Sequence, residues 1–226
     1  MSTSEIKDLI TSQGYSQSII PQLEQHLLSQ STSTTPYDFN ANRTLVKLYQ
    51  FFPSSSNAGY TTLVALLSIL FGSSAQFGAI NCLIPEGSAA KTDEPFSSIL
   101  ALNESRDACL FSNLWNTLQS LESSQVECVS EAVKSPHALK ALRESILDTL
   151  SLTFKTASLA LVLSSVNLTS ADDLKQFKIV ESADGDKVVF LENLENTRRD
   201  KAQHTENALD YGMVRGLIID AGVAVE

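Results

Sequence analysis

One apolar run, at residues 61–72, constrains the fold more than any other feature of the chain. Its large apolar residues recur at helical spacing but surround most of the helix: Leu63, Val64, Leu66, Leu67, Leu70 and Phe71. A helix that is apolar on several sides has to be buried on several sides, so we expect this one at the centre of a helical domain. The run is shorter than the roughly 18–20 residues that a membrane-spanning helix requires.

Narrower apolar stripes with three- and four-residue spacing flank this run on both sides, as in amphipathic helices. They cover residues 6–10, 19–28, 39–52, 77–84, 96–100, 110–121 and 126–133, and polar loops such as 29–36 and 85–94 separate them. In the clearest stripe, Trp115 is expected to be a core residue. The rhythm of helix and loop predicts a mainly α fold, with a HEAT-like helical repeat domain over residues 1–145.

The pattern changes near residue 145. Apolar residues between 146 and 163 predict one helix that ends at Asn167, and residues 171–177 predict a short helix. Residues 179–180 and 187–191 have strand character, and Asp184-Gly185 between them favours a hairpin turn. This order predicts a winged-helix domain over residues 146–195 with a small β-hairpin, followed by a linker and a C-terminal helix over residues 196–226.

No group of residues points to catalysis or to a bound cofactor. The motifs G-x-S-x-G, H-E-x-x-H, G-x-x-x-x-G-K-[ST] and G-x-G-x-x-G are all missing from the sequence. The histidines, expected to be solvated, and the cysteines are widely spaced: His26, His137, His204, Cys82, Cys109 and Cys128. We therefore expect no enzyme activity, no metal and no cofactor. An unrecognised hydrolase is the remote alternative, since folding can assemble a site from distant residues.

The charge of the chain argues against nucleic acid as its main partner. The formal net charge is −10, and residues 171–200, which include the expected wing, carry eight acidic and five basic side chains. Winged helices that bind nucleic acid concentrate Lys and Arg in this part of the domain. We therefore expect protein partners and no strong direct binding of RNA. A nucleic-acid-binding winged-helix protein is the alternative hypothesis.

Two segments offer apolar side chains to a partner. In the strand at 187–191 we expect Val189 and Leu191 to pack inward, which leaves Val188 and Phe190 exposed on an edge strand. A neighbouring subunit could cover such an edge by strand addition. The C-terminal helix carries Leu209, Tyr211, Met213, Leu217 and Ile218. Its apolar face could pack on the chain's own domain or enter a bundle with other subunits, and the sequence leaves both arrangements open.

Residues 37–51, Y-D-F-N-A-N-R-T-L-V-K-L-Y-Q-F, closely resemble a segment of one known family. The YD-x-x-AN…LKLYQF helix of subunit k of eukaryotic translation initiation factor 3 shares Tyr37, Asp38, Ala41, Asn42, Lys47, Leu48, Tyr49, Gln50 and Phe51 with it. Weaker likeness at 82–84, 111–118 and 152–160 extends the resemblance over about residues 35–220. The helical spacing of the segment predicts packing roles for Phe39, Leu45, Val46 and Tyr49.

The resemblance implies a HEAT-like domain followed by a winged-helix domain of the PCI type, in a non-enzymatic scaffold subunit. Subunits of this family build the factor that binds the small ribosomal subunit during translation initiation, and subunit k is expected to pair with subunit l. Proteasome-lid and COP9-signalosome subunits have related architecture, so a sister complex is a further alternative. The N-terminus lacks a signal-peptide pattern. The expected location is therefore the cytoplasm, with some nuclear presence and no membrane contact.

Overall fold

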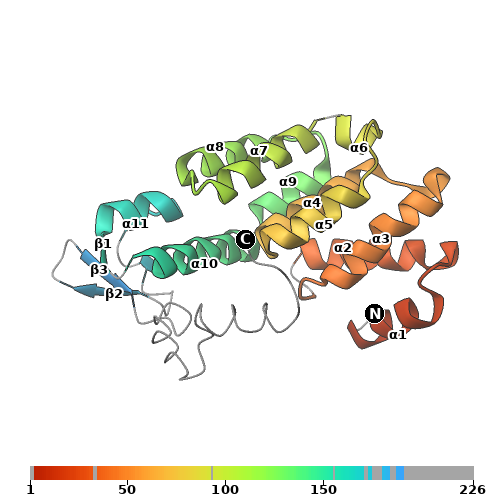
Figure 1. Ribbon diagram of the computed structural model, residues 1–226, viewed down its shortest axis with the longest axis horizontal. Helices are drawn as coiled ribbons and strands as arrows, with labels where there is room; N and C mark the ends of the chain where they lie inside the picture. Colours follow the sequence, from red (N-terminus) through yellow and green to blue (C-terminus); the bar gives the residue numbers. More distant parts are fainter. Residues whose placement is uncertain are drawn as a thin grey trace, which may run out of the picture. The chain divides into compact units, whose positions relative to one another are not determined.

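The computed structural model describes residues 3–32, 35–92, 94–154, 156–170, 173–174, 180–183 and 187–190. Met1–Leu191 form one compact unit, and Glu192–Glu226 lie outside the described residues. The α-helices (Figure 1) are α1 (Thr3–Gln13), α2 (Ile20–Ser31), α3 (Phe39–Phe51), α4 (Ala58–Leu70), α5 (Ser74–Leu83), α6 (Ala89–Thr92), α7 (Phe96–Asp107), α8 (Phe111–Leu121), α9 (Glu127–Lys134), α10 (Pro136–Thr153) and α11 (Leu159–Val166). Two 3-10 helices, η1 (Gln17–Ile19) and η2 (Pro53–Ser55), and three strands, β1 (Thr156–Ser158), β2 (Val180–Ala183) and β3 (Lys187–Phe190), complete the described elements.

Helix α4 is the centre of the helical part, as the sequence predicts. Every residue from 61 to 70 is buried, and α4 contacts α2, α3, α5, α6, α7, α9 and α10. Figure 1 shows it between the pair α2–α3 and the pair α7–α8. The side-chain oxygen of Asn57 accepts the N–H of Tyr60 and so caps the first turn. The mainly α fold is confirmed, while the HEAT-like repeat stays a prediction.

The single helix expected between residues 146 and 167 is wrong, because the structure has α10, β1 and α11 in its place. Phe154 follows α10 with extended backbone, and Ser158 then caps α11 by accepting the N–H of Leu161. β-Branched Thr153 and Thr156 and the aromatic Phe154 favour extended backbone, and a Ser cap begins a new helix. Asn167 does end α11, in the left-handed conformation. Since α10 runs unbroken through residues 145 and 146, the domain boundary expected there stays a prediction.

The three strands form an antiparallel sheet in the order β1-β3-β2. The predicted pairing of the hairpin strands is confirmed, since Val180 lies opposite Phe190 and Ser182 opposite Val188. The predicted edge position of β3 is wrong, because β1 pairs with its other side and places Ala157 opposite Val188. Val188 is fully buried, so it cannot serve as an exposed partner contact. The sequence did not predict β1, because its three residues are too few to show a strand pattern.

Candidate protein-docking groove

Large apolar side chains are exposed where α8, α10 and α11 meet. Leu110 is 52% exposed, and Leu152, Phe154 and Leu161 are each 42% exposed. A soluble protein tolerates a single exposed leucine, but a group of such side chains marks a surface that binds something. This junction is therefore the candidate site.

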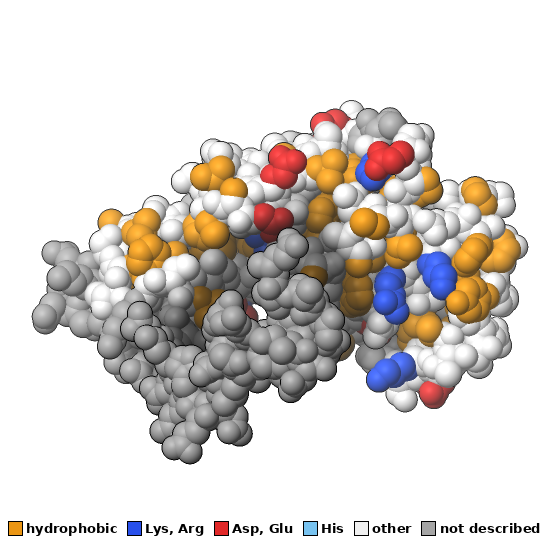
Figure 2. All heavy atoms as spheres, in the orientation of Figure 1, with side chains coloured by type: hydrophobic (Ala, Val, Ile, Leu, Met, Phe, Trp, Pro, Cys, Tyr) orange, Lys and Arg blue, Asp and Glu red, His pale blue; other side chains and the backbone are white. Residues whose placement is uncertain are grey.

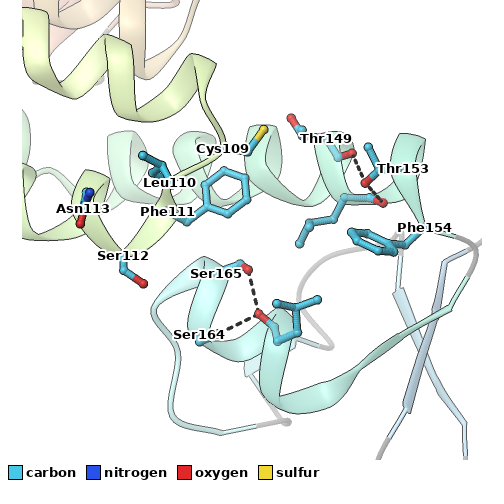
Figure 3. Close-up of a pocket in the computed structure, with 12 residues that line it drawn as sticks. Cys109, Leu110, Phe111, Ser112, Asn113, Thr149, Thr153, Phe154, Ser164 and Ser165 are labelled. Atoms are coloured by element: carbon cyan, nitrogen blue, oxygen red, sulfur yellow. Dashed lines mark hydrogen bonds between the residues drawn. The ribbon is translucent and has the colours of Figure 1, made fainter.

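A groove of about 460 Å³ lies between the start of α8, the last turns of α10, and α11. Its lining residues are Cys109, Leu110, Phe111, Ser112, Asn113, Thr149, Leu150, Thr153, Phe154, Leu161, Ser164 and Ser165. Figure 3 shows Phe111 and Phe154 projecting from α8 and from the end of α10 toward the same space, with Ser164 and Ser165 on α11. Among the described residues that line the groove there is no Asp, Glu, Lys, Arg or His, so the groove favours an apolar occupant.

The turn before α8 places Leu110 at the rim of the groove. Cys109 has a φ of 55°, in the left-handed region, and its N–H donates to the carbonyl of Arg106 over 3.1 Å. The N–H of Leu110 donates to the carbonyl of Ser105 over 2.8 Å. This pair of hydrogen bonds is the Schellman motif, which ends α7 and reverses the chain. As a result α8 packs back on α7, and the side chain of Leu110 is left exposed at the turn.

Four of the five hydroxyl groups that line the groove donate hydrogen bonds within their own helices. Thr149 donates to the carbonyl of Ser145 (2.9 Å), and Thr153 to that of Leu150 (3.1 Å). On α11, Ser164 and Ser165 donate to the carbonyl of Leu161 over 2.9 and 2.7 Å (Figure 3). A ligand that offers hydrogen-bond acceptors therefore gains little from these hydroxyls. The groove presents mainly carbon to its occupant.

Two long side chains fix α11 against the helical part. Nε1 of Trp115 donates to the carbonyl of Ser165 over 2.8 Å, and Nε of Arg143 donates to that of Val166 over 3.1 Å. The Arg143 guanidinium also lies 5.4 Å from the Trp115 ring centroid, and its burial lowers its pKa, an effect that Asp173 opposes. These bonds satisfy carbonyls that the end of a helix leaves without partners. The prediction that Trp115 is a core residue is confirmed.

A more polar pocket of about 540 Å³ adjoins the groove. It shares Ser112 and Ser164 with the groove and adds Asn116, Gln119, Glu122, Arg143 and Asn167 among its lining residues. A partner segment that runs along α8 would thus contact apolar side chains first and then amide and charged side chains. Such a change from an apolar centre to a polar edge is the usual anatomy of a protein–protein interface.

Of the residues that the sequence offered as partner contacts, the structure describes the side chain of Val188, which does not line this groove. Val188 is buried in the sheet, and Phe190 lies in β3, whose backbone pairs with β2. The other five, Leu209, Tyr211, Met213, Leu217 and Ile218, lie outside the described residues. Sequence reasoning missed Leu110, Phe154 and Leu161. One sequence feature could have indicated them. Each is an apolar residue that lies off the buried face of a helix or just beyond a helix end.

Metal-binding and membrane-spanning features were expected to be absent. In the residues with assigned placement, no three His, Cys, Asp or Glu side chains are arranged to hold a metal ion. None of the described helices has the length and apolar character that crossing a membrane requires. The expectation that His26 is solvated is wrong, because its side chain is buried on α2, with Nε2 3.9 Å from Oδ2 of Asp38.

The segment that carries the family resemblance takes part in a buried polar network. Gln30 of α2 and Asn42 of α3 exchange two amide hydrogen bonds of 3.0 Å each, and both are 2% exposed. The same Gln30 oxygen accepts the N–H of Asp38, whose carboxylate caps α3 by accepting the N–H of Ala41. The letters Y-D-x-x-A-N therefore encode a helix cap and a bond between two helices. Leu45, Val46 and Tyr49 are buried, as predicted, and Phe39 is partly buried.

Comparison with known proteins gives relatives of one kind. The chain is 26% identical over 173 residues to eukaryotic translation initiation factor 3 subunit K of Dictyostelium discoideum. It is 29% identical over 104 residues to the protein of that name from Xenopus laevis, and 30% over 109 residues to that from Pyricularia oryzae. The chain is thus similar, over part of its length, to proteins named eukaryotic translation initiation factor 3 subunit K from several eukaryotes. The predicted resemblance to subunit k is thereby confirmed.

The homology to subunit K covers part of each protein. The alignment with the Dictyostelium subunit K takes in 76% of this chain and 66% of the relative. The Xenopus and Pyricularia subunit K alignments take in 46% and 47% of this chain, and the chain spans 46% of the length of each relative. No protein-family model matches the chain.

Proposed function

We propose that this chain is a non-catalytic scaffold subunit of eukaryotic translation initiation factor 3, which holds a partner subunit in the groove between α8, α10 and α11. The homology to proteins named subunit K carries the proposal. The exposed side chains of Leu110, Phe154 and Leu161 support the docking mode, because their burial by a partner would be favourable. Through such contacts the chain would help to assemble the factor on the small ribosomal subunit during translation initiation.

The element that best fits the groove is an amphipathic helix of the partner. Helices commonly dock by laying apolar residues of one face into a groove between helices. With Thr149, Thr153, Ser164 and Ser165 bonded internally, the groove offers no row of free donors or acceptors of the kind an extended strand would need. Subunit l is the proposed partner, and the cytoplasm, with some nuclear presence, is the proposed location.

The order of elements after residue 135 supports a winged-helix domain of the PCI type as part of this proposal. The order is α10, β1, α11, then β2 and β3, with β1 beside β3 in the sheet. A winged helix has this succession of helix, strand, helix and hairpin. The pairing of sequential helices, α2 with α3 and α7 with α8, supports the HEAT-like description of the preceding part.

The test is to identify what co-purifies with the tagged chain from eukaryotic cells, using quantitative mass spectrometry. The unmodified chain should recover translation initiation factor 3 subunits. Recovery of proteasome-lid or COP9-signalosome subunits in their place would contradict the assignment to the factor. Recovery of RNA without these subunits would favour a nucleic-acid-binding protein instead.

A groove variant tests the docking mode in the same experiment. Leu161→Asp should lower recovery of the direct neighbour at least about 10-fold, because a carboxylate would have to be buried without a partner. Ala160→Asp is the matched control, since Ala160 is the preceding exposed residue of α11 and does not line the groove. Thermal unfolding of both variants should match that of the unmodified chain. Equal recovery with both variants would show that the groove is not the docking site.

A further inference from the structure

The exposed face of α3 carries two cations that lie between aromatic rings. Arg43 lies over the Phe39 ring, with Cζ 5.6 Å from the centroid, and Lys47 over the Tyr15 ring, with Nζ 4.4 Å from the centroid. The Tyr15 ring in turn lies 6.0 Å from the Phe51 ring. We call these five residues the cation–aromatic stripe. The α3 members are four residues apart, which places them along one side of the helix.

The fold does not require this arrangement. Tyr15 is 69% exposed and Phe51 is 54% exposed, while the opposite face of α3 buries Leu45 and Leu48. Aromatic rings left in water contribute little to stability, and polar residues would serve a solvated helix face as well. Two exposed aromatic rings beside two cations therefore indicate a surface that contacts a partner.

The stripe is positively charged on a chain whose formal net charge is −10. Helix α3 has no acidic residue, and in the described chain neither Arg43 nor Lys47 forms an ion pair. The nearby carboxylates are engaged elsewhere: Asp38 caps α3, and Glu24 accepts the hydroxyl of Tyr49 over 2.6 Å. Figure 2 shows Lys and Arg side chains beside hydrophobic ones over the surface formed by α1 and α3.

We propose that the cation–aromatic stripe is a second docking surface, separate from the groove, and that it binds an acidic segment of a protein. Two carboxylates of that segment would pair with Arg43 and Lys47, and an apolar side chain between them would cover Tyr15 and Phe51. Charge complementarity of this kind raises association rates and selects partners.

The charges favour a peptide over the other possible occupants. A second copy of the chain would bring cations against cations if it docked through the same stripe. A nucleic acid would present a long row of phosphates, of which Arg43 and Lys47 could neutralise only about two. The remaining phosphates would face a chain of net charge −10. A short acidic segment meets the two cations and extends little beyond them.

The test uses the full chain and a labelled 12-residue peptide that contains Asp, Glu and Leu only, with fluorescence anisotropy as the readout. Arg43→Glu should weaken binding at least about 10-fold at 50 mM salt, because one attraction becomes a repulsion. Lys134→Glu is the matched control, an equal charge reversal at an exposed position of α9, and should change the affinity less than about 2-fold. Phe51→Ala should weaken binding by about 3- to 5-fold through lost apolar contact.

Four results would overturn the proposal. They are no binding by the unmodified chain at 50 mM salt, equal binding of a peptide with Asn and Gln in place of Asp and Glu, an equal loss with Lys134→Glu, and tighter binding of a 12-nucleotide oligo(U) than of the peptide. The last would assign the stripe to nucleic acid. Leu161→Asp in the groove should leave peptide affinity unchanged, so the stripe can fail or succeed independently of the groove.

Discussion

The α2–α3 region and the α8–α10–α11 region both expose large apolar side chains, but they are held together differently. In the first region, the Gln30–Asn42 amide pair and the Asp38 cap join two neighbouring helices through a buried polar network. In the second region, two separate hydrogen bonds fix α11. Trp115 and Arg143 each donate one to a backbone carbonyl near the end of that helix.

The exposed groups of the two regions differ as well. The described lining of the groove has no Asp, Glu, Lys or Arg, whereas the stripe places Arg43 and Lys47 over aromatic rings. A groove of carbon gains affinity from water release and tolerates salt, while a charged stripe loses affinity as salt screens it. The comparison therefore suggests two docking modes in one chain, one set by packing and one set by charge.

The largest effect should come from breaking the polar network of the first region. Asn42→Ala removes two buried hydrogen bonds and leaves the Gln30 amide N–H without its acceptor, so we expect a loss of about 2–4 kcal/mol in the free energy of unfolding. Urea denaturation measures this loss. Asn40→Ala, at an exposed position of the same helix, is the control and should change stability by less than about 0.5 kcal/mol.

Replacing the Gln30–Asn42 amide pair by two apolar side chains sharpens this prediction. With Gln30→Leu and Asn42→Leu together, no side-chain amide is left unpaired, but the N–H of Asp38 loses the Gln30 oxygen that accepts it, so only part of the lost stability should return. A double variant that is less stable than Asn42→Ala would show that the hydrogen bond from Asp38 to Gln30 contributes to stability in addition to the Gln30–Asn42 pair.

Breaking the corresponding bond in the second region should have a smaller and more local effect. Trp115→Phe keeps an aromatic ring but removes the N–H that Ser165's carbonyl accepts, at a cost of about 1–3 kcal/mol. Hydrogen exchange should become faster for the amides of α11 and stay unchanged for those of α3. Equal acceleration in both helices would mean that the two regions unfold as one, and the comparison between them would fail.

Raising the salt concentration should weaken binding at the stripe by about 1 kcal/mol more than binding at the groove. Between 50 and 300 mM salt, binding of the acidic peptide to the stripe should weaken about 5- to 10-fold, because the exposed cations are screened. Capture of the groove partner should change less than about 2-fold over the same range, as expected for an interface without charged pairs at its centre. Similar salt dependence of both would mean that the partner also contacts the stripe.

The amino-acid pattern predicted the first region far better than the second. Periodic apolar residues were enough to predict α4 at the centre and the packing of Leu45, Val46 and Tyr49, because these depend on spacing along one helix. The hairpin pairing followed from strand character on both sides of a favourable turn. The role of Asn42 did not follow from the sequence, since its partner Gln30 lies in a segment that reads as a polar loop.

The groove could not be predicted for a different reason. Its lining comes from the start of α8, the end of α10 and α11, so it exists only once three segments are packed together. The split of the expected helix into α10, β1 and α11 depends on Ser158 as a cap and on the pairing of β1 with β3, which is about 30 residues away. Such non-local pairing leaves no periodic signal in a three-residue strand. The same pairing buries Val188, which local alternation alone placed on the outside.

The smallest effect should come from pH, and it should be confined to the first region. Burial lowers the pKa of His26, and Asp38, 3.9 Å away, opposes this only in part. In the unfolded chain the pKa is about 6.5, so as the pH falls below that value the unfolded state binds a proton that the folded state resists. The stability contributed by His26 is therefore complete above about pH 6.5 and is lost as the pH falls toward the folded pKa.

Thermal unfolding at pH 7 and pH 5.5 should show a larger decrease in the unfolding temperature for the unmodified chain than for His26→Gln, which cannot titrate. If the two decreases are equal, His26 contributes nothing to the pH dependence of stability.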